Sequence, residues 1–333
     1  MSRVRSYCSK LLACTSMALV SNITAQDALL PLYSASSGLD NPAALTGQPE
    51  TWSVEIQNAA RWSGVNTGFS TQAFAARLRV RPAGVEAQIG LRLVEDRLGP
   101  GLSHRSYGVQ AAVEQRINHE TVVGAGVQLG AARWAWDFAN LSWGSQYGAT
   151  GYDPTAATGE DETLLKGSSL YPDWALGVAL VHGIFSTEAA LHHGLQSAGL
   201  FEARADSMRF RLHQGAEIEL PIGPPHAAFG TLVLWQRGDF QGGWRHIEVG
   251  AEMRHTFGHN SQYTSNSRSN ELGIGLAYQS VGVLRPILSW RGYGGWSVRL
   301  GPAISAGPSG ASQGWALAIG YAPTAGLVNY PTR

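Results

Sequence analysis

Polar and apolar side chains alternate residue by residue along several stretches of this chain. From Arg209 to Leu220, arginine, histidine and glutamate occupy odd positions, while phenylalanine, leucine, alanine and isoleucine occupy even ones. Neighbouring side chains of a β-strand point to opposite faces, so this pattern predicts a strand with one polar and one apolar face. The same division recurs at 85–93 and 107–117. Repeated over roughly a dozen segments, it predicts a closed antiparallel sheet.

Segments of this kind, separated by turn residues, are typical of an outer-membrane barrel, whose apolar face meets lipid and whose polar face lines the lumen. After residue 25, no uninterrupted apolar stretch approaches the roughly 18 residues of a membrane-spanning helix. The alternative is a soluble, periplasmic all-β sandwich or barrel, which the 41 glycines and 14% charged residues also allow. Tryptophans near the segment ends favour the membrane barrel, because aromatic residues concentrate at the two interfaces. These residues are Trp62, Trp134, Trp174, Trp235, Trp244, Trp290, Trp296 and Trp315.

The predicted fold is therefore all-β: a single transmembrane antiparallel β-barrel of about 14 strands. The strands are expected at 51–62, 68–80, 84–95, 105–117, 120–133, 173–182, 184–193, 208–220, 227–237, 244–257, 270–279, 282–291, 295–305 and 313–321. An even number returns both termini to the periplasmic side. Long connections are expected at 135–172, 194–207 and 258–269, and together they predict an extracellular side opposite a side of tight turns.

The first 25 residues predict a cleaved secretory signal peptide, because three cations precede an apolar stretch from Leu11 to Val20. A lipoprotein cleavage box ending at Cys14 is the alternative, but it leaves too short an apolar core. The only two cysteines, Cys8 and Cys14, lie in this segment, so the mature chain has no disulfide, thiolate nucleophile or cysteine-bound metal. Residues 26–333 form the predicted barrel domain. Its lead-in, 26–50, carries Asn41-Pro42 and is expected beneath or inside the barrel mouth.

The polar faces of the predicted strands place both signs of charge in the lumen. The candidate lumen residues are Glu86, Arg92, Glu114, Arg116, Arg209, Arg211, Glu217, Glu219, Glu248, Glu252 and Arg254. A selective channel favours one dominant sign along its wall, whereas mixed charges pair across strands. We therefore expect a lumen largely filled by side chains, loops or the lead-in.

Other chemistry finds little support in the sequence. Lys166 is the only lysine after the signal peptide, and the slightly acidic mature chain offers no basic field for nucleic acid. Acidic residues at 160–162 lack the alternating spacing of a calcium loop, so a solvated acidic face is favoured. His192 and His193 are adjacent and are expected on opposite faces, which argues against shared metal binding.

Glycine pairs at 124–126 and 273–275 do not complete a dinucleotide fingerprint, and they are expected where strands bend or side chains pack closely. No Gly-x-Ser-x-Gly elbow occurs. The sequence thus predicts no catalytic, cofactor or metal site.

Several short motifs occur in a fixed order between about residues 26 and 321. They are Asn41-Pro42-Ala43 with Gly47, Gln57 to Trp62, Gly90 leading into Val94 to Gly99, Trp143 to Tyr147, Gly151 to Pro154, Thr158 to Glu160, Tyr171 to Trp174 and Leu191 to His193. In order and spacing they resemble the PorP/SprF family, outer-membrane proteins associated with the type IX secretion system and gliding motility of Bacteroidota.

The resemblance implies an outer-membrane barrel that works with secretion components, or with one secreted surface protein such as a large adhesin, and it brings no catalytic residues or cofactor. Asp96, Arg97, Tyr171 and Asp173 are the candidate partner-facing rim residues, although such turn-forming motifs also serve loop architecture. The alternative function is a porin-like channel for a small solute. The mixed lumen charges and the motif series favour the secretion role.

Overall fold

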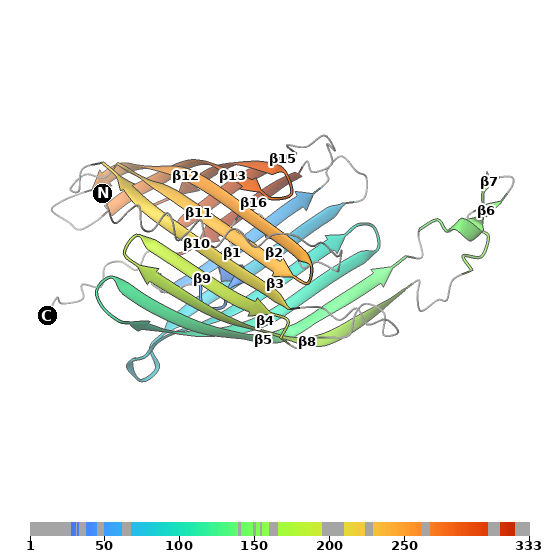
Figure 1. Cartoon of the computed structure of the whole chain (residues 1–333), viewed down its shortest axis with the longest axis horizontal. Coiled ribbons are helices and arrows are strands. Elements are labelled where there is room, and N and C mark those ends of the chain that lie inside the picture. The colour runs from blue at the N-terminus through green and yellow to red at the C-terminus, as the bar shows by residue number, and fades with distance from the viewer. Residues whose placement is uncertain are drawn as a thin grey trace.

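The protein's fold is given by a computed structural model that describes residues 28–30, 32, 38–44, 50–61, 68–138, 141–148, 151–153, 155–159, 166–194, 210–223, 229–260, 267–305 and 314–323. Long strands close into one antiparallel barrel (Figure 1). They are β1 (Trp52–Arg61), β2 (Phe69–Val80), β3 (Glu86–Leu98), β4 (Leu102–Arg116), β5 (Thr121–Asp137), β8 (Lys166–His182), β9 (Phe185–His192), β10 (Arg211–Ile222), β11 (Gly230–Gln241), β12 (Trp244–Asn260), β13 (Ser267–Gln279), β14 (Val283–Arg291), β15 (Trp296–Ser305) and β16 (Gly314–Tyr321). The predicted all-β barrel of about 14 strands is confirmed.

Shorter elements lie between the barrel strands. They are η1 (Pro82–Gly84), η2 (Gly144–Gln146) and the small hairpin of β6 (Tyr147–Gly148) and β7 (Gly151–Tyr152). Within the described ranges, no helix is long and apolar enough to cross a membrane. The expected signal peptide and Arg209 lie outside the described residues.

β1 closes the barrel because it pairs with β2 on one side and β16 on the other. Val54, for example, stands opposite Ala76 in β2 and Tyr321 in β16. Closure leaves no open strand edge in the wall. Since neighbouring strands run antiparallel, β1 begins and β16 ends at the same end of the barrel, which we call the terminal end; the opposite one is the far end.

The prediction that all three long connections lie on one side of the barrel is wrong for 258–269. The connections after β5 and β9 leave from the far end, but the connection after β12 leaves from the terminal end. β12 and β13 also continue further than expected, since Gly258 pairs with Ser269 and Asn260 with Ser267. The two strands thus include half of the expected 258–269 loop, and the antiparallel strand order fixes the side on which the connection lies.

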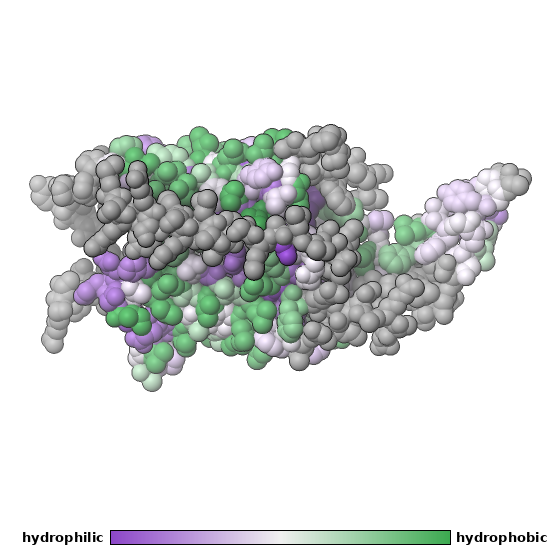
Figure 2. Space-filling view, viewed as in Figure 1, coloured by the Kyte–Doolittle hydropathy of each residue, from purple (hydrophilic) through white to green (hydrophobic). Residues whose placement is uncertain are grey.

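The alternation of the sequence appears as alternation of exposure. Apolar side chains such as Val109, Leu129 and Ile274 are exposed on the outside of the wall, while their sequence neighbours point inward. Figure 2 shows hydrophobic residues gathered over the barrel wall. A closed barrel with such an outer face satisfies its backbone internally and presents hydrocarbon to lipid.

Only some of the tryptophans expected at the interfaces face outward. Trp290, Trp296 and Trp315 are exposed, but Trp134 and Trp235 are buried. Trp134 packs beside His104 at 4.4 Å between ring centroids, and Trp235 donates to Glu248 inside the barrel. Their places on the inward phase of β5 and β11 explain the difference. Trp62 lies outside the described residues.

Candidate functional site

The lumen contains the described residues of the lead-in, 28–30, 32 and 38–44. Leu30, Leu32, Leu39 and Ala43 are all buried. They pack against small inward side chains of the wall, which leave room for a second layer of chain. Leu30 and Leu39 cluster with Ala73, Ala75 and Val94, and Leu32 clusters with Ala59, Ala316 and Ala318.

Side chains of the wall bind backbone carbonyls of the lead-in. Arg92 of β3 donates to the carbonyl of Leu39 at 2.6 Å, and His192 of β9 donates to that of Asp40 at 2.6 Å. Three more side chains donate to backbone carbonyls of the lead-in: Arg61 to that of Leu29, Gln57 to that of Leu32 and Arg237 to that of Leu30. A buried carbonyl without a partner is unfavourable, so these contacts allow a segment outside the sheet to lie in the interior.

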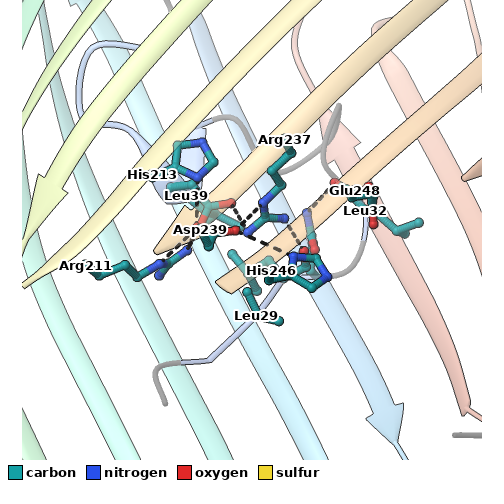
Figure 3. A network of polar contacts seen from close by, with 12 residues as sticks. Leu29, Leu32, Leu39, Arg211, His213, Arg237, Asp239, His246 and Glu248 are labelled. Carbon is teal, nitrogen blue, oxygen red and sulfur yellow. Dashed lines mark hydrogen bonds and ion pairs between the residues drawn. The ribbon is translucent and has the colours of Figure 1, made fainter. Parts of the chain in front are cut away.

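A buried ion cluster joins the lead-in to β10 and β11. Asp40 lies 2.9 Å from Arg211 and 3.0 Å from Arg237. Asp239 lies 2.8 Å from the same two guanidinium groups and 3.0 Å from Nδ1 of His213. Figure 3 shows Arg211, His213 and Arg237 converging on Asp239. We call these five residues the Asp40 cluster; its two carboxylates and two guanidiniums balance in charge, which buried ions require.

The Asn41-Pro42 turn sits against β8 and β9. The side-chain amide of Asn41 donates to the carbonyl of Val178 at 3.1 Å and to Glu188 at 3.0 Å, and its Oδ1 accepts the amide of Ala43 at 2.9 Å. The turn is thus fixed to the wall and closed on itself.

Two paired glycines make room for this turn. Gly126 of β5 stands opposite Gly177 of β8. A Cβ on Gly177 would lie 2.0 Å from Oδ1 of Asn41, and one on Gly126 would lie 2.7 Å from the carbonyl carbon of Pro42. The close packing expected at 124–126 therefore occurs at Gly126, against the lead-in.

We expect Gly177→Val to lower the free energy of unfolding by about 1–3 kcal/mol, because the added side chain overlaps the turn. Chemical unfolding monitored by tryptophan fluorescence measures the change. The control is Gly148→Val in β6, where an added Cβ meets no atom within 4 Å. Equal unfolding curves for the two variants would contradict the close fit.

Most predicted lumen residues lie on the inward phase of their strands. Arg92, Arg211, Glu248 and Glu252 are buried. Glu86, Glu114, Glu217 and Arg254 are partly buried, and Arg116 and Glu219 are exposed. Opposite charges pair across strands, as in Arg79 with Glu114 at 3.5 Å.

A second cluster surrounds Glu252 of β12. Its carboxylate lies 2.7 Å from Arg299 of β15 and 3.3 Å from Arg254, and it accepts a hydrogen bond from Ser289 of β14. We call these four residues the Glu252 cluster.

The rim assignment needs correction for three of its four residues. Asp96 is buried and accepts the hydroxyl of Thr71 at 2.5 Å. Tyr171 is buried and bonds His104 at 3.0 Å, while Asp173 is buried and bonds His193 at 3.0 Å.

Their burial has a simple cause. β3 runs to Leu98 and β8 begins at Lys166, so these residues lie within strands, on the inward phase, instead of in loops. Only Arg97 is exposed, with its Nε 3.2 Å from Glu95.

His192 and His193 do not point to opposite faces, because both are buried. His193 follows the end of β9 with a φ of 58°, and this left-handed conformation breaks the strand alternation. Each histidine has a partner, a carbonyl for His192 and a carboxylate for His193. Among the residues placed by the structure, no group of three or more His, Cys, Asp or Glu is arranged to hold a metal. The acidic residues 160–162 lie outside the described ranges.

At the far end, β5 and β8 carry a projecting arm, which comprises η2, β6, β7 and the described residues to 159 (Figure 1). Gln146 organises it, since its Oε1 accepts the amide of Trp143 at 2.9 Å and its Nε2 donates to Ala156 at 3.1 Å. Tyr147 and Tyr152 pair across the hairpin, 5.2 Å apart, and both rings are exposed. Exposed aromatic rings on a projecting arm are suited to protein contact.

Comparisons with solved structures return outer-membrane barrels at low identity. The toluene transporter TbuX of Ralstonia pickettii matches with a TM-score of 0.48 and 11% identity, over 87% of this chain and 94% of that one. Omp33 of Acinetobacter baumannii matches with a TM-score of 0.42 and 8% identity, over 83% of this chain and all of that one (100%). No curated protein matches the chain.

The family comparison is more specific. The family model described as type IX secretion system membrane protein PorP/SprF matches residues 22–285, most of the chain. This family is a class of secretion-system membrane protein and not a class of enzyme, and the closed barrel with an apolar outer face is an outer-membrane form. The chain belongs to the PorP/SprF family of type IX secretion system membrane proteins.

Proposed function

We propose that this barrel is an anchor in the outer membrane that holds a secreted surface protein, such as a large adhesin, to the type IX secretion system. The observation that carries the proposal is the filled lumen. The described part of the lead-in, 28–30, 32 and 38–44, lies among side chains from β1, β3, β9, β10 and β11, and the Asp40 cluster holds it there. A barrel whose interior is occupied by its own chain serves better as a rigid support than as a pore.

The arm supports the same function. We assign the terminal end, where β1 begins and β16 ends, to the periplasm, so that the far end faces the cell exterior, where a secreted partner arrives. The exposed Tyr147 and Tyr152 stand beyond the wall on that side, and exposed Arg97 lies at the far end of β3. We assign partner contact to the arm and Arg97. In this proposal the chain has no catalytic role. Where the protein that it holds is a motility adhesin, the barrel contributes to gliding motility by anchoring that adhesin.

Affinity isolation of the tagged full chain from mildly solubilised outer membranes, followed by mass spectrometry, tests the anchor. We expect recovery of a very large secreted protein or of secretion-system subunits. Conductance in planar bilayers is measured on the same preparation. Recovery of the barrel alone, together with a stable open state for small solutes, would replace the anchor with the porin-like channel.

We expect the double substitution Tyr147→Ser and Tyr152→Ser to reduce partner recovery about tenfold or more, because aromatic anchors dominate protein interfaces. The matched control is Tyr293→Ser, an equally exposed tyrosine in the turn after β14, at the terminal end. If both variants recover the partner equally, the arm is not its docking site.

A further inference from the structure

One buried arginine of the wall has two donor atoms without an acceptor. Arg77 of β2 faces inward with 8% of its surface exposed, and neither its Nε nor its Nη2 has a hydrogen-bond partner. The guanidinium group keeps its proton at any ordinary pH, so it is a lasting buried cation. Glycine at position 38 makes room for it, since a Cβ there would lie 1.8 Å from Nη2.

Arg77 lines a cavity of about 190 Å³ near the terminal end of the barrel. The cavity lies between β1, β2 and the strands from β12 to β16, and Gly38 and Ala44 of the lead-in form part of its wall. Glu50 and Ala322, next to the first and last strands, also line it, so it lies on the side where the chain enters and leaves. Its position separates it from the Asp40 cluster.

The other arginines around the cavity, and two of its three glutamates, already have partners. Arg254 and Arg299 belong to the Glu252 cluster, and Arg291 lies 3.9 Å from Glu271. Glu55 accepts a hydrogen bond of 2.7 Å from Gln57. Arg77 is therefore the cation whose donors are available within this cavity.

We propose that this cavity binds a small carboxylate, with Arg77 as its principal partner. A planar guanidinium group matches a carboxylate with two parallel hydrogen bonds. The lining also carries three glutamates, Glu50, Glu55 and Glu271, so a singly charged carboxylate meets less repulsion there than a doubly charged phosphate. The carboxylate belongs either to a free small acid or to the C-terminus of a peptide that enters from the terminal end. This inference is independent of the anchor function.

Titration calorimetry on the folded full chain in detergent tests the proposal with three probes. They are acetate, trialanine with a free carboxylate, and trialanine amide. We expect saturable binding of acetate, of free trialanine or of both, and none of the amide. Binding of acetate alone identifies a free acid as the source, and binding of trialanine alone identifies a chain terminus. Absence of binding by both would overturn the site.

Arg77→Gln is expected to weaken the binding about tenfold or more, because a charge-assisted pair of hydrogen bonds is lost. Arg116→Gln, which removes an exposed arginine on β4, is the control and should bind as the original chain does. Ser53→Leu, which narrows the cavity and leaves Arg77 in place, provides a second route if Arg77→Gln does not fold. Undiminished binding by the folded Arg77→Gln variant or by Ser53→Leu would overturn the assignment.

Discussion

Replacing Arg211 with methionine is expected to lower the free energy of unfolding by about 3–5 kcal/mol, since breaking a buried ion pair leaves an uncompensated charge. Arg211 is fully buried, and its guanidinium contacts Asp40 at 2.9 Å and Asp239 at 2.8 Å. Methionine preserves much of the volume but leaves two carboxylates facing Arg237 and His213 alone. Urea unfolding in detergent, followed by tryptophan fluorescence, measures the change.

Arg116→Met is the matched control, because Arg116 is an exposed arginine at the terminal end of β4. It should alter the free energy of unfolding by no more than about 0.5 kcal/mol. Similar losses in both variants would show that the Asp40 cluster does not stabilise the barrel beyond an ordinary surface charge.

A double variant separates the ion pair from packing. Asp40→Asn removes one of the two negative charges that lose a partner in Arg211→Met, so the two substitutions together restore the charge balance of the cluster. We expect the double variant to unfold with a smaller loss than the sum of the single losses, by about 0.5–3 kcal/mol. Simple additivity would mean that Asp40 and Arg211 do not interact.

The fold was predictable because each strand of this barrel separates two different environments. Lipid outside and a charged lumen inside impose a period of two, and that period is visible in the sequence without knowledge of any contact. The inward phase of Arg211, Glu248 and Glu252 follows from the same pattern. Strand ends were less predictable, since pairing of β5 with β8 continues to Asp137 and Lys166, beyond the alternating segments.

The Asp40 cluster was only partly predictable. Asp239 lies in β11 beyond Arg237, where the predicted strand ended, and a longer strand would have placed both on the inward phase. The burial of Asp40 could not be predicted in this way, because Asp40 lies outside the sheet, where polar and apolar residues do not alternate. The left-handed backbone of His193 was equally hidden, since it depends on tertiary contacts and not on a glycine.

Deleting residues 28–44 is expected to give a stable open state in planar bilayers that the full chain lacks. Side chains alone fill barrels of about eight strands, and barrels of about 16–18 strands leave a water-filled channel. This barrel lies nearer the second size. Its alanine-lined patches, such as Ala73 with Ala75, leave space that Leu30 and Leu39 occupy.

The matched control for this deletion is removal of the arm, residues 141–159, with a short turn joining β5 to β8. The arm stands outside the barrel (Figure 1), so its removal should leave the conductance unchanged. Both variants must unfold cooperatively in urea before conductance is compared, because Arg92 and Arg237 lose acceptors when the lead-in is removed. A folded deletion variant that remains closed would mean that inward side chains fill the lumen without the lead-in. An open full chain would instead favour the channel, because the bound lead-in would then leave a continuous path for solute.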